Sequence, residues 1–242
     1  MQKRFYFNLT SLLVLTMGYA QAQLSITSSG ANTNQAIRLY DPLRTRYSNI
    51  EGSPYVPSDT VQQGWLVINN KRTPTKLRYN SQTGEVEYMQ DNKVVTPINP
   101  VTEFAIMTTD TILFRKGFPA AGTWTANEFY QILYNGRKAK LVKHIRSDIK
   151  ANTDQMQNDY GKERFRKLEE HYVWIATVKP PTENYFEKLS DGEMKSVVAS
   201  KKSLASLFPQ YASQIDRYLS EQKLKLKSWA EFASVLRFLD TQ

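Results

Sequence analysis

The chain contains no cysteine among its 242 residues. Disulfide bonds, thiolate metal sites and cysteine nucleophiles are therefore excluded. Histidine is almost as scarce: the chain has two, His144 and His171, and neither belongs to a His-x-His or His-Glu-x-x-His pattern. A zinc site needs three or four ligands, usually histidine, cysteine or carboxylate. We therefore predict no metal centre, and we interpret both histidines as ordinary strand or surface residues.

Glycine is also sparse, with ten residues in the chain. None belongs to a G-x-x-x-x-G-K-[ST] or G-x-G-x-x-G loop, which would cradle phosphates with backbone amides. No G-x-S-x-G nucleophile elbow is present, although a triad assembled from distant residues would leave no such motif. We therefore predict no nucleotide or other cofactor, and no catalytic residue can be assigned from the sequence.

Long apolar runs are confined to the N-terminus. Lys3 and Arg4 precede the apolar residues 12–15, and the small-x-small pattern of a cleavage site stands at residues 20–22. This order predicts that residues 1–22 are a signal peptide; a short buried helix is the alternative. No apolar run of about 18 residues follows, so we expect no transmembrane segment in the mature chain. We predict an exported protein of the periplasm, the outer-membrane periphery or the extracellular medium.

Acidic residues are in the minority. The chain has 32 lysines and arginines against 23 aspartates and glutamates, which gives a net charge of +9 at pH 7. Loss of Lys3 and Arg4 with the signal peptide would leave +7 on the mature chain. A charge of this sign attracts polyanions without identifying one. We predict an envelope polyanion or another envelope protein as the partner, and no nucleic acid in the natural setting.

The sequence after the signal peptide changes character twice. Residues 23–57 are polar and predict a flexible or irregular N-terminal arm. The tyrosines of this arm that could pack on the body are Tyr40, Tyr47 and Tyr55. Residues 58–199 consist of short alternating segments separated by turn residues, which indicates an antiparallel β-rich body. Residues 200–242 follow a helical period and predict C-terminal helices.

The best-defined hairpin joins residues 76–79 to residues 85–88 through a turn rich in polar residues and glycine. A four-residue loop at 81–84 brings apolar side chains together on one face and opposite charges together on the other. A slip by one residue would place apolar side chains opposite glutamates. The predicted cross-strand pairs are Leu77 with Tyr88, Arg78 with Glu87, and Tyr79 with Val86.

A second hairpin is predicted at Asn135-Gly136, the strongest short hairpin signal in the chain. A two-residue turn there gives the pairs Tyr134 with Arg137, Ile132 with Ala139, and Tyr130 with Leu141. Asp191-Gly192 predicts a further turn, between strands at 184–189 and 193–198. Further strands are expected at residues 65–68, 101–107, 111–115, 127–134, 137–145 and 172–177. Residues 147–170 are polar and indicate an irregular or helical segment.

The C-terminal residues predict about three amphipathic helices. Ser200 can cap the first, Pro209 ends that helix or begins the next, and Ser228 with Glu231 forms a capping box for the last. The apolar stripes of these helices need a surface to cover, and the sheet is the nearest. We therefore predict an α+β fold: an antiparallel β-meander, either an open sheet or a partial barrel, with the C-terminal helical segment packed on it.

Two segments carry a resemblance to known proteins. They are TKLRYNSQTGEVEYM followed by INP, and SKKSLASLFPQYASQIDRYLSEQKLKLKSWAEFASVLRFL near the C-terminus. The chain resembles uncharacterised secreted β-rich proteins of Bacteroidetes with a helical C-terminal tail. The resemblance covers roughly half of the mature chain. It implies a Gram-negative envelope or secreted setting and carries over no catalytic residue.

Paired carboxylates would be needed for glycoside hydrolysis, about 5–10 Å apart across a cleft. Glu85 and Glu87 share a strand face, but Lys76 and Arg78 on the facing strand are their expected partners. The other acidic pairs lie in polar segments typical of a solvated surface; they are Glu169 with Glu170 and Asp154 with Asp159. No pair stands out as catalytic.

Basic residues gather between residues 137 and 150. Strand alternation places Lys138, Lys140, His144 and Arg146 on one face, with aromatic Phe129 on the preceding strand. A basic face beside an aromatic side chain can engage phosphates or sugars; a solvated outer face of the sheet is the alternative. The candidate polyanion-binding residues are Arg137, Lys138, Lys140, Lys143 and Arg146.

The export signal, the β-rich body and the lack of catalytic motifs together predict the kind of protein. We expect an exported non-enzymatic cell-envelope or secreted protein with a binding or structural role. Its ligand is not defined by the sequence. The alternative is a secreted hydrolase of an envelope or environmental polymer that uses an unrecognised carboxylate pair.

Overall fold

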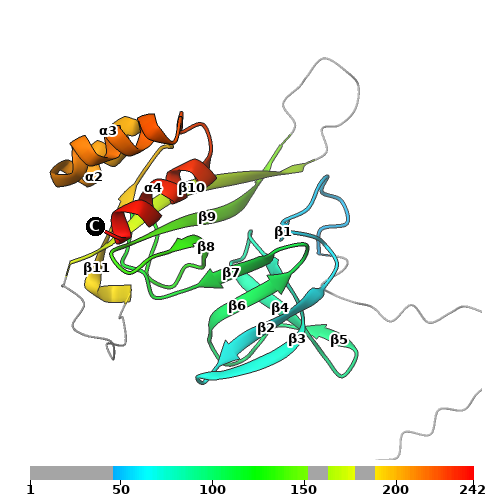
Figure 1. Ribbon diagram of the computed structural model, residues 1–242. Coiled ribbons are helices and arrows are strands. Elements are labelled where there is room, and N and C mark those ends of the chain that lie inside the picture. Colours follow the sequence, from blue (N-terminus) through cyan, green and yellow to red (C-terminus); the bar gives the residue numbers. More distant parts are fainter. Residues whose placement is uncertain (1–45, 152–162, 178–188) are drawn as a thin grey trace, which may run out of the picture. The chain divides into compact units, whose positions relative to one another are not determined.

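A computed structural model describes residues 46–151, 163–177 and 189–242, all within the unit Asp41–Gln242. These residues form eleven strands in one sheet and three α-helices (Figure 1). The predicted signal peptide and residues 23–45 of the predicted arm lie outside them. Within the described residues, no helix combines the length and the apolar character that crossing a membrane requires.

All pairs of strands in the sheet are antiparallel, and the sheet stays open. The strand order is β11-β10-β9-β8-β7-β6-β2-β3-β4-β5, with β1 paired to β3. The strands are β1 (Tyr55–Val56), β2 (Gln62–Ile68), β3 (Lys71–Asn80), β4 (Glu85–Gln90), β5 (Lys93–Val95), β6 (Val101–Met107), β7 (Thr111–Arg115), β8 (Tyr130–Asn135), β9 (Ala139–Lys150), β10 (Arg164–Ala176) and β11 (Gly192–Ser196). From β2 onward, consecutive strands are neighbours except that β6 returns to lie beside β2. The predicted α+β fold with an open antiparallel sheet is confirmed.

Strands β2 to β7 supply most of a core, called the core of β2–β7 below, because alternate residues of each strand point to the same face. Leu77 and Tyr79 of β3 are fully buried there. The rings of Phe104 and Phe114 stack with centroids 4.7 Å apart, and Phe129 meets Phe104 edge-on at 4.8 Å. Aromatic pairs of this kind contribute about 0.5–1.5 kcal/mol beyond their buried area, so the cluster holds β3, β6 and β7 together.

Three helices end the chain. They are α2 (Lys201–Leu207), α3 (Ala212–Glu221) and α4 (Trp229–Asp240). As predicted, Ser200 Oγ accepts a hydrogen bond from Ser203 N, and Ser228 Oγ accepts one from Glu231 N. These bonds satisfy amides of the first helical turn that have no partner within the helix. Pro209 begins the next element, a 3-10 turn that precedes α3.

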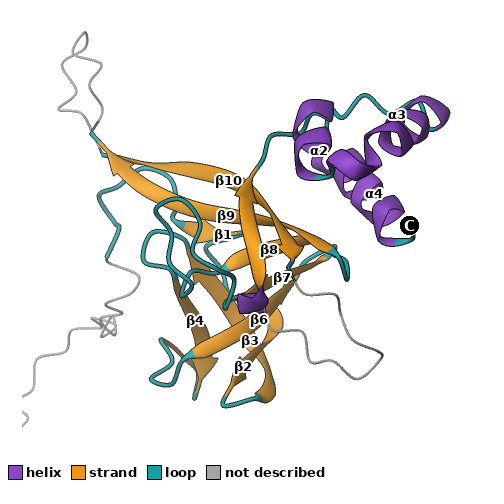
Figure 2. Ribbon diagram, turned by 90° about the vertical axis from the view of Figure 1, so that its left-hand side faces the viewer, coloured by secondary structure: helices purple, strands orange, loops and turns teal. Residues whose placement is uncertain are grey.

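The helices cover one face of the half-sheet β8–β11 (Figure 2). Leu141 of β9 and Val173 of β10 are fully buried in one cluster with Leu204, Ile215 and Leu236, which come one from each helix. Burying an aliphatic side chain of this size contributes about 1.5–3 kcal/mol. The predicted packing of the C-terminal segment on the sheet is thereby confirmed.

The opposite face of this half-sheet is covered by residues 116–129, which connect β7 to β8 and are called the cover loop below. Phe118 of the loop is fully buried, with its ring edge-on to Tyr130 at 5.4 Å. Backbone hydrogen bonds in both directions between Ala121 and Trp124 close a tight turn within the loop. This half-sheet is therefore covered on both faces, an arrangement that was not predicted from the sequence.

The predicted register of the first hairpin is confirmed at every residue pair. Strands β3 and β4 pair Leu77 with Tyr88, Arg78 with Glu87, and Tyr79 with Val86. Tyr79 and Val86 are buried in the core of β2–β7, and the Arg78 and Glu87 side chains form an ion pair. Local pattern and cross-strand charge were sufficient to fix this hairpin.

The predicted register of the second hairpin is wrong. Tyr130 pairs with His144 and Tyr134 pairs with Leu141, instead of the partners that a two-residue turn would give. The register shifts between Ile132 and Tyr134, where β8 carries one extra residue. The turn between β8 and β9 is therefore longer than the Asn-Gly signal predicts.

Asp240, the last residue of α4, explains the longer turn. Its carboxylate accepts hydrogen bonds from Arg137 N at 3.2 Å, from Lys138 N at 2.9 Å and from Tyr134 Oη at 2.5 Å. A Cβ atom at Gly136 would clash with the same carboxylate. A residue about 100 positions away along the chain thus shapes the turn, and no local pattern could reveal it.

The segment expected to be irregular or helical is mostly strand where the structure describes it. Strand β9 continues to Lys150 and β10 begins at Arg164, and these two residues pair with each other. Residues 164–170 are exposed or half-buried, which explains why their composition is polar although they belong to the sheet. Residues 152–162 lie outside the described residues.

The turn expected at Asp191-Gly192 is described in part. Leu189, expected at the end of a strand, belongs to the 3-10 turn Leu189–Asp191, and β11 pairs with residues 172–176 of β10. Residues 184–188 lie outside the described residues. A Cβ atom at Gly192 would clash with the indole of Trp174, so this position requires glycine for close packing.

The described end of the predicted arm, residues 46–57, is attached to the sheet. As expected, Tyr47 and Tyr55 pack on the body: Tyr47 meets Phe165 edge-on at 5.1 Å, and Tyr55 is 6% exposed in β1. Tyr40 lies outside the described residues.

Candidate binding site at His144

Three side chains form a row across β8, β9 and β10. Tyr130 pairs with His144, and His144 pairs with Glu170. Directly paired residues of antiparallel strands point to the same face, with Cβ atoms about 4.5–5.5 Å apart. The row therefore brings a phenol, an imidazole and a carboxylate side by side on the face that the cover loop covers, with Glu170 exposed at its edge. It exists because of the register that the sequence did not predict.

The cover loop adds two side chains to this row. The ring of Trp124 lies against the imidazole of His144, with centroids 4.1 Å apart. The indole Nε1 of Trp124 donates a hydrogen bond to Glu170 Oε2 at 2.7 Å. Glu128 Oε2 lies 3.6 Å from His144 Nε2. His144 is thus held between the sheet and the loop by a ring contact and a carboxylate.

His144 is in its neutral form at pH 7. Its side chain is 4% exposed, and this burial lowers its pKa below the ordinary value, although the nearby carboxylate of Glu128 acts in the opposite direction. A neutral imidazole has one donor and one acceptor nitrogen. The group can therefore both donate and accept a hydrogen bond at this site.

Glu170 is held as a carboxylate. Tyr172 Oη donates to Glu170 Oε2 at 2.5 Å, and this bond, together with the one from Trp124, lowers the pKa of the carboxyl. Burial raises the pKa of Tyr130 to about 12, and Glu128 and Glu170 act in the same direction. At neutral pH the row therefore consists of a phenol, a neutral imidazole and a carboxylate.

A cavity of about 220 Å³ opens beside His144. Its walls come from the β3–β4 turn, from the cover loop and from β9, which are far apart in the sequence. The polar and aromatic side chains that line it include Gln82, Thr83, Trp124, Glu128, His144 and Arg146.

The β3–β4 turn is fixed against β9. Ser81 Oγ lies 2.7 Å from Ser147 Oγ, and Ser147 N donates to the carbonyl oxygen of Ser81 at 3.1 Å. Within the turn, Asn80 Oδ1 accepts hydrogen bonds from Gln82 N at 3.1 Å and from Thr83 N at 3.4 Å. This wall of the cavity is therefore held in place before any ligand binds.

Two polar atoms of this wall are buried without a hydrogen bond. Gln82 Oε1 and Thr83 Oγ1 make none within the part of the chain that the structure describes. A buried polar group that lacks a partner costs about 1–3 kcal/mol. Both residues line the cavity, but the two oxygens themselves have almost no accessible surface. A ligand bound there could supply the missing partners once a side-chain rotation turns either oxygen toward it.

The five residues predicted to bind a polyanion do not form one surface, because they differ in burial and in the face of the sheet on which they lie. Arg137 is exposed at the β8–β9 turn, and Lys138 Nζ donates to the carbonyl oxygen of Leu239 at 3.4 Å. Lys140 is 2% exposed, and its Nζ donates to the carbonyl oxygen of Gly136 at 2.7 Å. The interpretation of this strand face as a solvated surface is therefore wrong at Lys140, and equally at the buried His144.

Lys143 and Arg146 point to opposite faces of β9. Lys143 Nζ lies 3.0 Å from Glu169 Oε1. Arg146 shares the face of His144; its Nε lies 2.8 Å from Asp148 Oδ1, and its guanidinium lies 5.4 Å from the centroid of the Trp124 ring. Of the five residues, Arg146 is the one that lines the cavity. Polyanion binding by this set stays a prediction.

The residues that build the cavity were not predicted from the sequence. His144 was expected to be an ordinary strand or surface residue, and no binding role was expected for Gln82, Thr83, Trp124 or Glu128. Their spacing matches no local motif, because the chain brings them together only through the tertiary fold. The one available signal was the position of His144 on a strand face, which does not reveal what covers it.

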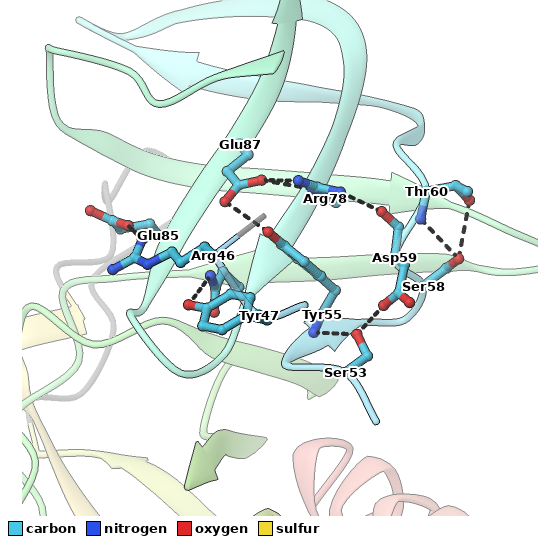
Figure 3. Close-up of polar contacts among 11 residues, drawn as sticks. Arg46, Tyr47, Ser53, Tyr55, Ser58, Asp59, Thr60, Arg78, Glu85 and Glu87 are labelled. Carbon is cyan, nitrogen blue, oxygen red and sulfur yellow. Dashed lines mark hydrogen bonds and ion pairs between the residues drawn. The ribbon is translucent and has the colours of Figure 1, made fainter. Parts of the chain in front are cut away.

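The carboxylates considered in the sequence have structural partners where they are described. Glu87 Oε2 lies 2.7 Å from Arg78 Nη2, and Tyr55 Oη donates to Glu87 Oε1 at 3.2 Å (Figure 3). The predicted pairing of Glu87 with Arg78 is confirmed, whereas Glu85 lies 3.9 Å from Arg46. The contacts of Glu87 with Arg78 and Tyr55 indicate a structural role for Glu87 and not a catalytic one. Asp154 and Asp159 lie outside the described residues.

The fold and the site together define an α+β protein with a small, preformed polar cavity. Among the described residues, no three histidine, aspartate or glutamate side chains are grouped so that they could hold a metal ion. Comparisons with family models, with curated proteins and with solved structures found no match. The function is therefore inferred from the site itself.

Proposed function

We propose that the chain is an exported, non-enzymatic protein of the cell envelope or the extracellular medium that binds a small polar ligand in the cavity beside His144. Export is supported by the order of Lys3, Arg4, an apolar run and small residues at the N-terminus. The resemblance to secreted proteins of Bacteroidetes agrees with that setting. Binding is supported by the geometry of the cavity.

The unpaired oxygens of Gln82 and Thr83 carry the proposal. They lie in a turn whose backbone is fixed to β9, so only a side-chain rotation is needed to turn either oxygen toward the cavity. A ligand that donates to Gln82 Oε1 and bonds with Thr83 Oγ1 would recover the free energy that their burial costs.

The scarcity of histidine provides a direct test. His144 lines the cavity, whereas His171 lies on the opposite face of the sheet and stacks on Trp229 with ring centroids 3.8 Å apart. The mature chain would be titrated with neutral sugars, amino acids, polyamines and phosphate esters while the two imidazole NMR signals are followed. His171→Gln assigns the signals.

Binding in the cavity should shift the signal of His144 and leave that of His171 in place. A panel in which no compound shifts His144, at concentrations on the order of tens of millimolar, would contradict the proposal, because even weak binding is detected in that range.

The alternative of a secreted hydrolase has one observation in its favour: Glu128 and Glu170 both act on His144 electrostatically and so lie close to it. Against it, Glu170 already accepts two hydrogen bonds, and its lowered pKa makes it a poor proton donor. Incubation with envelope polysaccharides and measurement of new reducing ends decides between the two. Release that is abolished by Glu128→Gln would favour the hydrolase.

A further inference from the structure

The cavity beside His144 has room for one small ring. Its volume of about 220 Å³ is below the ~300–1,000 Å³ that is typical of sites for drug-sized molecules. A hexose or an amino acid fits this space, and a larger ligand would extend out of it.

The polar side chains of the cavity both donate and accept. The amide of Gln82, the hydroxyl of Thr83 and the neutral imidazole of His144 each offer both functions, and the carboxylate of Glu128 accepts. A hydroxyl group also donates and accepts through one atom, so a ligand with several hydroxyls can match this set. A phosphate or carboxylate accepts only; it could bond with the donors of the cavity but would have no proton to offer the carboxylate of Glu128.

The charges around the cavity favour an uncharged ligand. Glu128 and Arg146 are the charged residues that line it within the described part of the chain, and they have opposite signs. Arg146 Nε pairs with Asp148 at 2.8 Å, which offsets part of its charge. Glu128, Arg146 and Asp148 together carry a net negative charge, and the nearby carboxylate of Glu128 would repel an anion.

Trp124 adds an apolar surface to these polar groups. Its ring is half-buried, and the hydrogen bond from its Nε1 to Glu170 together with the contact to His144 fixes its orientation. A pyranose ring has hydroxyls at its rim and a face of C–H groups, so it gains from packing on an indole while its hydroxyls are bonded. An amino acid lacks the several hydroxyls that the other walls would satisfy.

We infer that the ligand is a single uncharged pyranose unit, either a free hexose or the terminal unit of an envelope glycan. The inference rests on the proposed binding function and defines its ligand class. The hydroxyls of the sugar bond with Gln82, Thr83 and Glu128, and its C–H face packs on Trp124.

The test uses the methyl glycosides of glucose, galactose and mannose in both anomeric forms, with glucuronate as the charged comparison. Binding to the mature chain is measured by calorimetry and by the NMR signal of His144. We expect at least one neutral glycoside to bind with a dissociation constant in the millimolar range or below. Glucuronate should bind at least about fivefold more weakly, because its carboxylate meets Glu128.

Variants connect the binding to the cavity. Thr83→Val keeps the shape of the side chain and removes the hydroxyl, so affinity for the best glycoside should fall about tenfold; Gln82→Met serves the same purpose if that variant does not fold. Glu128→Gln should remove most of the discrimination against glucuronate. Glu169→Gln is the matched control, because Glu169 pairs with Lys143 on the other face. It should change neither the affinity for the glycoside nor the discrimination against glucuronate.

The possible results distinguish a failure of the pyranose inference from a failure of the proposed binding function. If amino acids or phosphate esters shift His144 and no neutral glycoside does, the pyranose is excluded while the binding function stands. If no compound shifts His144, both fail. Unchanged glycoside affinity in the folded Thr83→Val and Gln82→Met variants would also overturn the inference. A trisaccharide of the best sugar that binds as tightly as the methyl glycoside indicates a glycan end, and weaker binding indicates a free hexose; either result supports the pyranose.

Discussion

Glu85 and Glu87 lie two residues apart on one face of β4, but their surroundings differ. The side chain of Glu87 is 1% exposed and is bonded to Arg78 and Tyr55. The side chain of Glu85 is 45% exposed and lies 3.9 Å from Arg46. Breaking a buried ion pair leaves one charge without its partner in a poorly solvated place, whereas an exposed pair contributes about 0–1 kcal/mol.

We therefore expect Glu87→Gln to lower the free energy of unfolding by about 3 kcal/mol and Glu85→Gln by less than about 0.5 kcal/mol. Urea denaturation of the two variants at pH 7 measures both values. Equal losses would contradict the structural role assigned to the buried pair.

The two histidines make stability depend on pH. Burial lowers the pKa of His144, and it lowers the pKa of His171 to about 4, with the charge of Lys143 acting in the same direction on His171. In the unfolded chain both groups titrate near 6.5. Between about pH 4 and 6.5 the unfolded chain therefore binds more protons than the folded one, and the free energy of unfolding decreases as the pH falls through this range.

We expect a decrease between about pH 7 and pH 5 of at most about 1.4 kcal/mol per pH unit for each histidine, and less for His171 because it is half-buried. Urea denaturation across this range measures it, and His171→Gln should make the curve flatter. Two results would show that the lowered pKa values do not govern the pH dependence of stability. One is a free energy of unfolding that rises on acidification. The other is a pH dependence in His171→Gln that is as steep as that of the natural chain.

For single residues, the contacts that could be predicted are those between residues close together in the sequence. The pair of Arg78 and Glu87 follows from one hairpin and one alternation rule. The surroundings of His144 do not, because Trp124 and Glu128 lie in a loop whose position depends on a core that forms elsewhere. Lys140 was misjudged for the same reason: nothing near it in the sequence indicates that both faces of β9 are covered.

At the scale of elements, helix α4 and the β8–β9 turn depend on each other through Asp240. We expect Asp240→Asn to lower the free energy of unfolding by about 2 kcal/mol, since an amide cannot accept the bonds from Tyr134 Oη, Arg137 N and Lys138 N together. Urea denaturation measures the loss, and the backbone amide signals of the turn should move.

Asp216→Asn is the matched control for this change. Asp216 lies in α3, is 53% exposed and pairs with Lys201 at 3.0 Å. Its replacement should cost less than about 0.5 kcal/mol and leave the turn signals unchanged. Equal losses at Asp216 and Asp240 would mean that Asp240 does not hold the turn.

Helix ends could be predicted where their hydrogen bonds lie within one helix, and could not be predicted where the bonds come from another segment. Both serine caps were predicted, because Ser200 and Ser228 bond within their own helices. The second half of the predicted capping box differs: the carboxylate of Glu231 accepts hydrogen bonds from the amides of Lys225 and Lys227. The link before α4 turns back over the helix start, and sequence pattern does not specify that path.

At the scale of the whole molecule, strand β9 joins three clusters of buried side chains. Leu141 belongs to the cluster under the helices, Val142 to the cluster under the cover loop, and Ile145 to the core of β2–β7. His144 contacts the ring of Tyr130 at 5.4 Å and lines the cavity. The class of the fold could be predicted from alternating and helical periods, but this shared strand could not, because each cluster takes its partners from a different part of the chain.

Because β9 is shared, we expect the helices and the sheet to unfold together. Leu236→Ala removes a fully buried side chain of α4 and should lower the free energy of unfolding by about 2–5 kcal/mol. Native-state hydrogen exchange should then show the same loss for the best protected amides of β6 and of α4. Glu221→Ala, at an exposed pair with Arg217 in α3, should change neither by more than about 0.5 kcal/mol. A loss confined to α4 would mean that the helices open alone. A common loss would mean that the helices and the sheet that carries the cavity belong to one cooperative unit.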